Sequence, residues 1–199
     1  MSALFITFEG IEGAGKTTLA RWLVERLQQE GISSWFTAEP WEPRLREVLL
    51  EHGELRREEE LLLFLADRAI HTRHIRRALA EGKSVICDRY ADSTTVYQGY
   101  GRGLDIEWVR KLNQFATGGL QPARTYLLDL PVEVGLRRQR EHNRIGAEER
   151  TFHERVRAGF LEEAKREPAR VLLLDATQPL PELQRQIWED VEQFVRASL

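Results

Sequence analysis

Short apolar runs alternate with longer amphipathic stretches along this 199-residue chain. The short runs are typical of buried β-strands, whereas the longer stretches carry apolar residues at the three- and four-residue spacing of helices. This alternation predicts an α/β fold, with a parallel sheet flanked by helices on both faces. The expected strands are residues 4–8, 33–38, 84–88, 125–130 and 171–175.

Helical patterns fill most of the chain between these strands. Gly31, Gly82 and the glycine pair 118–119 stand where helices are expected to end, and Pro131 favours the first position of another helix. Residues 89–103 are expected to form a polar connecting segment. The expected helices are 17–29, 44–52, 58–80, 106–116, one opening at 131, 152–166 and 180–197, and the expected core positions of the longest are Leu61, Leu62, Leu65, Ala69 and Leu79.

Neither a repeat nor a convincing linker interrupts this pattern, so we expect one domain spanning residues 1–199. A content of 42 % hydrophobic and 31 % charged residues is ordinary for a globular enzyme. The net charge of −3 argues against a general nucleic-acid or membrane-surface binder. No secretory signal or membrane-length apolar run is visible, so we expect a cytoplasmic protein in which Cys87, the only cysteine, is a buried thiol.

The most specific motif follows the first expected strand. Residues 10–17 match G-x-x-x-x-G-K-[ST], a loop whose glycines let backbone N–H groups surround phosphate oxygens at the start of a helix. Lys16 would reach the β- and γ-phosphates of a nucleotide, and the Thr17 hydroxyl would bind Mg²⁺. Since ligands of such folds bind at the carboxyl ends of the strands, one site should be bordered by the loops after residues 8, 38, 88, 130 and 175.

Asp88 and Arg89 follow the third expected strand. A carboxylate beside a phosphate loop suits Mg²⁺, bound directly or through water, and the arginine after it can hold two phosphate oxygens at once. Alternatively, Asp88 caps a helix and Arg89 forms a surface ion pair.

Arginines crowd the segment of about residues 137–151. In isolation, such a run is usually a solvated helix face. After a phosphate loop, it is typical of a lid that excludes water and whose arginines neutralise the transferring phosphoryl group. The arginines are Arg137, Arg138, Arg140, Arg144 and Arg150, interrupted by Asn143 and Gly146.

Phe64, Arg68 and His71 are spaced to share one face of the longest helix. An aromatic ring with an arginine one turn later suits a nucleobase, which would stack on the ring and present a carbonyl edge to the guanidinium. The alternative is that Phe64 is simply a core residue of a leucine-rich helix.

These motifs, in order over nearly the whole chain, resemble the thymidylate kinases of the bacterial type. The resemblance implies a P-loop kinase fold with a five-stranded parallel sheet and a small lid, a homodimer, and phosphoryl transfer from MgATP to dTMP. The matching stretches are residues 9–18, 63–68, 88–90, 93–103 and 175–177.

The resemblance also assigns roles to residues at matching positions. Phe64 would stack on thymine, Arg68 would contact the base, Arg89 would hold the acceptor phosphate, and Glu12 would lie near the sugar 3′-hydroxyl. The expected ATP-binding residues are Gly10, Ile11, Glu12, Gly13, Ala14, Gly15, Lys16, Thr17 and Thr18, with Asp175, Ala176, Thr177 and Gln178 bordering adenine. The expected acceptor-binding residues are Glu12, Glu39, Pro40, Phe64, Arg68, Arg89, Ser93, Thr94, Tyr97 and Gln98, and the expected metal ligands are Thr17, Asp88 and Glu9.

The phosphate loop contains no arginine, whereas the lid contains several. This distribution resembles the bacterial type, in which the lid supplies the catalytic cation. Arg144 is the first candidate for that role and Arg150 the second, with Arg155 and Arg157 as further possibilities on the next helix. Together with Lys16 and Arg89, Arg144 and Arg150 form the expected catalytic set.

The chain departs from the family after the second strand. Bacterial members commonly have Arg-Glu-Pro-Gly-Gly there, and this chain has Ala-Glu-Pro-Trp-Glu at residues 38–42. A flexible loop has become bulky, and a cationic contact near the acceptor phosphate is missing. Glu-Pro followed closely by Trp also resembles the deoxyribonucleoside kinases, in which a glutamate at this loop, here Glu39, takes the proton from a 5′-hydroxyl.

The leading interpretation is therefore a dTMP kinase, whose acceptor is already anionic and requires cations rather than a strong base. A deoxynucleoside kinase with Glu39 as general base is the second interpretation. A nucleotide-binding relative with little turnover, acting as a sensor or scaffold, is the third. A GTPase is disfavoured because the Asn-Lys-x-Asp motif is absent, and the pattern of Phe64, Arg68 and Tyr97 disfavours adenylate and guanylate kinases.

Overall fold

The computed structural model describes residues 3–51, 53–139 and 144–196 and contains a five-stranded sheet. The strands lie in the order β2-β3-β1-β4-β5, and every neighbouring pair is parallel. The α/β fold and the parallel sheet predicted from the sequence are confirmed. The strands are β1 (Phe5–Glu9), β2 (Ser34–Ala38), β3 (Ser84–Asp88), β4 (Arg124–Asp129) and β5 (Val171–Asp175).

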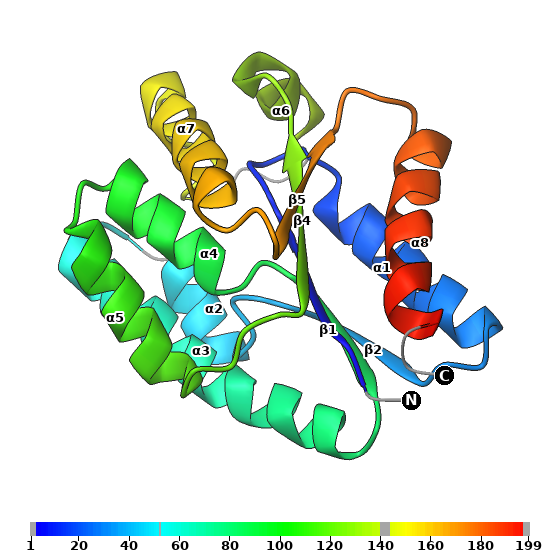
Figure 1. The fold of residues 1–199 in the computed structure, drawn as a ribbon. Helices are drawn as coiled ribbons and strands as arrows, with labels where there is room; N and C mark the ends of the chain where they lie inside the picture. The colour runs from blue at the N-terminus through cyan, green and yellow to red at the C-terminus, as the bar shows by residue number, and fades with distance from the viewer. Residues whose placement is uncertain (1–2, 52, 140–143, 197–199) are drawn as a thin grey trace.

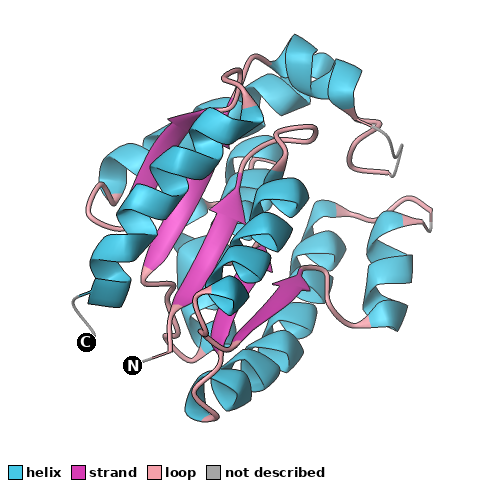
Figure 2. Ribbon diagram, turned by 90° about the vertical axis from the view of Figure 1, so that its right-hand side faces the viewer, coloured by secondary structure: helices cyan, strands magenta, loops and turns pink. Residues whose placement is uncertain are grey.

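Helices cover both faces of this sheet. Figure 1 views the sheet nearly edge-on, with α1 and α8 on one side and α3, α4, α5 and α7 on the other. In Figure 2 the strands rise side by side from the end at which both termini lie, so their carboxyl ends share the opposite edge. The helices are α1 (Lys16–Gln29), α2 (Pro43–Leu50), α3 (Arg57–Ala80), α4 (Ala91–Thr94), the π-helical segment η1 (Thr95–Gly101), α5 (Ile106–Thr117), α6 (Val132–Arg138), α7 (Arg150–Arg166) and α8 (Leu180–Arg196).

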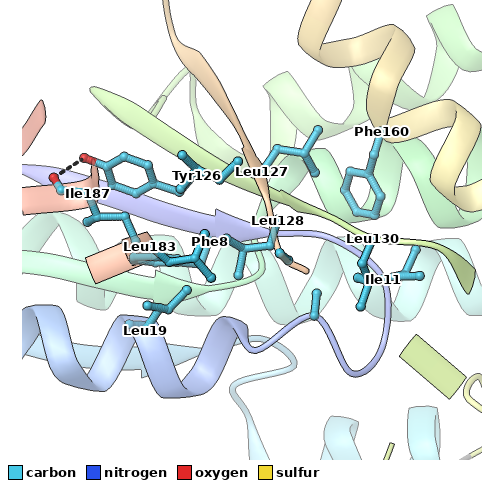
Figure 3. Packing of buried hydrophobic residues seen from close by; sticks show 14 of the residues in the cluster. Phe8, Ile11, Leu19, Tyr126, Leu127, Leu128, Leu130, Phe160, Leu183 and Ile187 are labelled. Atoms are coloured by element: carbon cyan, nitrogen blue, oxygen red, sulfur yellow. Dashed lines mark hydrogen bonds between the residues drawn. The ribbon is translucent and has the colours of Figure 1, made fainter. Parts of the chain in front are cut away.

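The largest hydrophobic cluster joins the central strands to helices on both faces of the sheet. Phe8 of β1 and Tyr126 of β4 pack with Leu19 of α1, Phe160 of α7 and Ile187 of α8, and all of these side chains are buried (Figure 3). The Tyr126 hydroxyl is also satisfied, since it donates to Asp190 Oδ2 at 2.8 Å, with the Ile187 carbonyl 3.4 Å away (Figure 3). This packing fixes the end of β1 and the start of α1, between which the phosphate loop lies.

Helix α3 differs from its prediction in which face it buries. Leu61 and Leu65 are buried as expected and Leu79 is partly buried, but Leu62 is 62 % exposed and Ala69 is also exposed, so these two core predictions were wrong. The helix instead turns a polar stripe inward, which contains Asp67, Arg68, His71 and Thr72. Buried polar groups need partners, and those of α3 are supplied by residues distant in sequence.

Residues 89–103 form more helix than the sequence suggested. The segment contains α4 and η1, and Asn113 of α5 holds it by donating to the Ala91 carbonyl and the Thr95 hydroxyl, both at 3.0 Å. Tertiary contacts therefore override its weak helical pattern. A smaller difference concerns Pro131, which precedes α6 rather than forming its first residue.

Two further sequence expectations can be compared with the described residues. Cys87 is fully buried and carries a free thiol, as predicted. No helix within the described ranges combines the length and the apolar character needed to cross a membrane.

Candidate active site

A cavity of about 510 Å³ opens at the carboxyl edge of β1, β2 and β3. It is lined by every side chain that the sequence analysis assigned to the acceptor, and also by Thr17 and Asp88. The strands explain this convergence, because parallel strands deliver their following loops to one edge. Six further lining residues were not predicted from the sequence: Arg21, Phe36, Ala38, Arg46, Leu50 and Ile145.

The phosphate loop holds its lysine tightly. The Lys16 Nζ donates to the carbonyl of Gly10 at 3.0 Å and to that of Ile11 at 2.8 Å. Burial, with the nearby positive charge of Arg89, lowers the pKa of Lys16 to about 8. Gly15 caps the N-terminus of α1 with a φ of 92°, so the helix dipole is directed at the loop.

Helix α6 lies directly against this loop. Gly13 has a φ of 72°, and a Cβ at this position would stand 2.1 Å from the Gly135 carbonyl oxygen. From the same helix, Arg138 donates to the Ala176 carbonyl at 3.0 Å. Thus α6 joins the phosphate loop to residues 175–178, the segment expected to border adenine. Within that segment, Asp175 accepts hydrogen bonds from both the backbone N–H and the hydroxyl of Thr177.

Two of the expected metal ligands lie in direct contact. The Thr17 hydroxyl donates to Asp88 Oδ2, while Asp88 Oδ1 is buried and finds no hydrogen-bond partner among the described residues. Within those same ranges no three His, Cys, Asp or Glu side chains gather as a metal site. A hydroxyl and one under-satisfied carboxylate fit Mg²⁺, which takes its remaining ligands from nucleotide phosphates and water.

Glu9, the third expected ligand, has a different environment. Its carboxylate accepts hydrogen bonds from the Tyr90 N–H at 2.7 Å and from the Ser93 hydroxyl at 2.6 Å. Burial and the negative charge of Asp92 raise the pKa of Glu9 to about 8. Glu9 thereby anchors the chain that follows Arg89, and its role toward Mg²⁺ stays a prediction.

Arg89 is held in a left-handed conformation, with a φ of 69°. Its guanidinium donates to Glu12 Oε1 at 2.9 Å and to the Tyr97 hydroxyl at 3.1 Å, and that hydroxyl donates to Glu12 at 2.8 Å. Strained backbone of this kind persists where surrounding contacts determine it. The three side chains therefore form a fixed group in the cavity wall.

The carboxylate of Glu12 is kept ionised by its neighbours. Burial raises the pKa of Glu12, but Arg89, His153 and Lys16 together bring it well below its usual value. His153 Nδ1 lies 3.4 Å from Glu12 Oε2, and the ring is almost fully buried. His153 had no motif around it, so the sequence analysis did not single it out.

A second buried ion pair lies deeper in the cavity. Arg68 Nη2 donates to Glu39 Oε2 at 2.5 Å, and His71 Nδ1 lies 3.0 Å from the other oxygen of that carboxylate. Arg68 also donates to the Thr94 hydroxyl at 2.7 Å. These contacts pair both terminal nitrogens of Arg68 and commit both oxygens of Glu39, while Arg68 Nε is buried without a hydrogen-bond partner among the described residues. Phe64, one turn before Arg68, is partly buried and packs against the main hydrophobic cluster while lining the cavity.

The unusual loop at residues 38–42 is fastened to α3. Asp67 accepts hydrogen bonds from the backbone N–H of Trp41 at 2.9 Å and of Glu42 at 2.7 Å. The Trp41 ring stacks on His71, with centroids 5.5 Å apart, and contacts His74 at 4.3 Å. Trp41 is not among the residues lining the cavity, so its bulk lies beside the cavity rather than in it.

The arginines expected in the lid are engaged elsewhere. Arg144 donates to the Leu49 carbonyl at 2.9 Å and pairs with Glu60 at 2.7 Å, and Arg150 pairs with Glu133 and Glu154. Neither lines the cavity, and Arg140 and Asn143 lie outside the described residues. The catalytic roles of Arg144 and Arg150 stay predictions.

Comparisons with known proteins agree on one family. The sequence model described as thymidylate kinase matches residues 8–187. A thymidylate kinase from Desulfovibrio desulfuricans is 48 % identical over 210 residues, covering 97 % of each chain. One from a Synechococcus species is 49 % identical over 194 residues, covering 95 % of this chain and 94 % of the relative. The crystal structure of thymidylate kinase from Ehrlichia chaffeensis superimposes with a TM-score of 0.73 and 34 % identity, covering 87 % of this chain and 93 % of that one.

The contact between Gly13 and α6 yields a prediction. Gly13→Ala and Gly31→Ala both force alanine into a left-handed conformation, at φ values of 72° and 76°, which costs about 1–3 kcal/mol of folding free energy. Only Gly13→Ala also meets backbone, whereas Gly31 has open space around it. Gly13→Ala should therefore weaken binding of a fluorescent ATP analogue by about tenfold or more, and Gly31→Ala should leave it unchanged. Equal affinities in both variants, at similar stability in urea, would show that the loop does not depend on this contact.

Proposed function

This chain belongs to the thymidylate kinase family, and we propose that it transfers a phosphoryl group from MgATP to dTMP, giving dTDP and ADP. The observation that carries the proposal is the composition of the cavity. It combines Phe64 and Arg68, suited to a nucleobase, with Arg89, suited to a phosphate, beside the loop that holds Lys16. A nucleoside monophosphate is the ligand that uses all three groups.

On the donor side, the phosphate loop binds the β- and γ-phosphates of ATP, and residues 175–178 border its adenine. Thr17 and Asp88 hold the metal, and the free Oδ1 of Asp88 is the contact that supports this assignment. Bound Mg²⁺ would offset the negative charge of the donor phosphates. Lys16, already aimed into the loop, adds a second positive charge there.

On the acceptor side, the phosphate of dTMP is anionic near neutral pH, so the attacking oxygen needs no strong base. It needs positive charge and orientation, which Arg89 supplies because Glu12 and Tyr97 fix its guanidinium. We assign Glu12 to the sugar 3′-hydroxyl and Phe64 to thymine. Among the lid residues, Arg144 forms an ion pair with Glu60. To contact the transferring phosphoryl group, Arg144 would have to leave this ion pair.

A homodimer belongs to the same proposal. Leu62 on α3 and Trp108 and Phe115 on α5 are 62 %, 57 % and 86 % exposed. The two helices pack against one another through Leu61, Leu65 and Val109, so their outer sides form one surface with several uncovered apolar groups. A second copy of this chain would cover them.

The proposed reaction is tested by measuring ADP release from MgATP with dTMP, thymidine and the other nucleoside monophosphates. We expect turnover with dTMP. Lys16→Ala should reduce it by about 100-fold or more without changing the circular dichroism spectrum, since a positive charge on the transferring group is lost. Turnover with thymidine alone would favour a deoxynucleoside kinase in which Glu39 is the general base. ATP binding without phosphoryl transfer to any acceptor would favour a nucleotide-binding protein with little turnover.

Phe64→Ala should weaken dTMP binding by roughly 1–3 kcal/mol, as expected when a base loses an aromatic stacking partner. The KM for ATP should stay as in the unsubstituted protein, because Phe64 belongs to the proposed base-binding part of the cavity and not to the phosphate loop. The measurement is the pair of KM values together with the thermal midpoint. A large drop in stability with no change specific to dTMP would mean that Phe64 is a core residue only.

For the dimer, Phe115→Asp should convert the protein to a monomer in sedimentation equilibrium, because a charge would be buried in the interface. Leu180→Asp is the matched control: this leucine is 43 % exposed on α8, which covers the opposite face of the sheet (Figure 1). Dissociation by Leu180→Asp, but not by Phe115→Asp, would place the interface elsewhere.

A further inference from the structure

Arg21 is a cation at the cavity that no motif indicated. It lies on α1 one turn after Thr17, so the two side chains share a helix face, and both line the cavity. Its guanidinium carbon stands 4.2 Å from the centroid of the Phe36 ring. A cation–π contact of this kind uses none of the guanidinium N–H donors, so they stay available to a ligand.

The charges lining the cavity are unevenly matched. Arg68 pairs with Glu39 and Arg89 pairs with Glu12. Arg21, by contrast, pairs with no carboxylate within residues 3–51, 53–139 and 144–196. With Asp88 assigned to Mg²⁺, an excess of positive charge remains on this side of the cavity, and an anionic ligand would balance it.

The end of β2 explains why Arg21 can reach this place. Side chains alternate along a strand, and Thr37 points away to His71, at 2.8 Å. Phe36 and Ala38 therefore share the other face, which α1 covers. Ala38 contributes only a methyl group to the cavity wall, and Arg21 extends over Phe36 into the adjoining space.

We propose that Arg21 binds the phosphate of dTMP, as a second cation opposite Arg89. The inference rests on the proposed function and adds a residue to its acceptor site. Arg89 is partly neutralised by Glu12, whereas Arg21 brings an unpaired charge and a planar pair of donors that match a phosphate. Arg46, the other lining arginine without a carboxylate among the described residues, instead directs Nη1 toward the Pro40 carbonyl at 3.4 Å.

The test compares binding of dTMP and thymidine by calorimetry, which needs no turnover. Thymidine lacks the phosphate, so Arg21→Gln should weaken dTMP binding by about 10- to 100-fold and leave thymidine binding unchanged. The KM for ATP should also be unchanged. Arg26→Gln is the matched control, because Arg26 lies on the same helix over the Trp188 ring and does not line this cavity; it should alter dTMP binding by less than about threefold.

A rescue experiment tests whether the positive charge itself, rather than the arginine at position 21, is what dTMP binding requires. In the Arg21→Gln background, Ala38→Arg restores a cation from β2 on the same face and should recover most of the lost dTMP affinity. The proposal is overturned if Arg21→Gln binds dTMP normally, if it weakens the binding of dTMP and thymidine equally, or if Arg26→Gln weakens dTMP binding to the same extent. Failure of the proposed function would differ, because the unsubstituted protein would then bind dTMP no more tightly than thymidine.

Discussion

The site depends on the backbone contact between the phosphate loop and α6. A Cβ at Gly13 would lie 2.1 Å from the Gly135 carbonyl oxygen, and one at Gly135 would lie 2.6 Å from the Glu12 carbonyl oxygen. The loop and the helix can therefore approach this closely only because both positions are glycine. The contact links β1 and α1 to the helix after β4, and through Arg138 to the loop after β5. A donor nucleotide bound here therefore meets parts of the chain that are distant in sequence but fixed by one close approach.

Buried ion pairs give the acceptor side its geometry. Removing Arg68 and Glu39 from water has a desolvation cost, against which their attraction and hydrogen bond act. The benefit is that these contacts fix the positions of the side chains. Arg68 also donates to Thr94. Glu12 and Tyr97 orient Arg89 before any ligand binds. A site prepared in this way spends less of its binding energy on ordering side chains, which is the usual origin of electrostatic preorganisation.

The sequence was sufficient for the sheet and for the residues that follow its strands, because hydrophobic alternation and the phosphate-loop motif are local signals. Lys16, Asp88 and Arg89 meet because parallel strands share a carboxyl edge. The inward polar stripe of α3 could not be found in this way, since Arg68 and His71 are buried only because Glu39 comes from a different element. Arg21 was equally invisible: an arginine on a helix surface has no sequence feature that separates a cavity wall from open solvent.

The altered loop after β2 combines two changes with different consequences. Trp41 adds bulk, but its ring rests on His71 and His74 while Asp67 holds its backbone, so the bulk stabilises the loop outside the cavity. Ala38 stands where the family resemblance leads us to expect an arginine, and the cavity wall also contains Arg21, whose guanidinium lies over the Phe36 ring. Under the proposed role of Arg21, the positive charge that an acceptor phosphate requires comes from a helix and not from the end of the strand. The phosphate requires a positive charge, but that charge can come from either element as long as the side chain reaches the cavity on the face of β2 that carries Phe36 and Ala38.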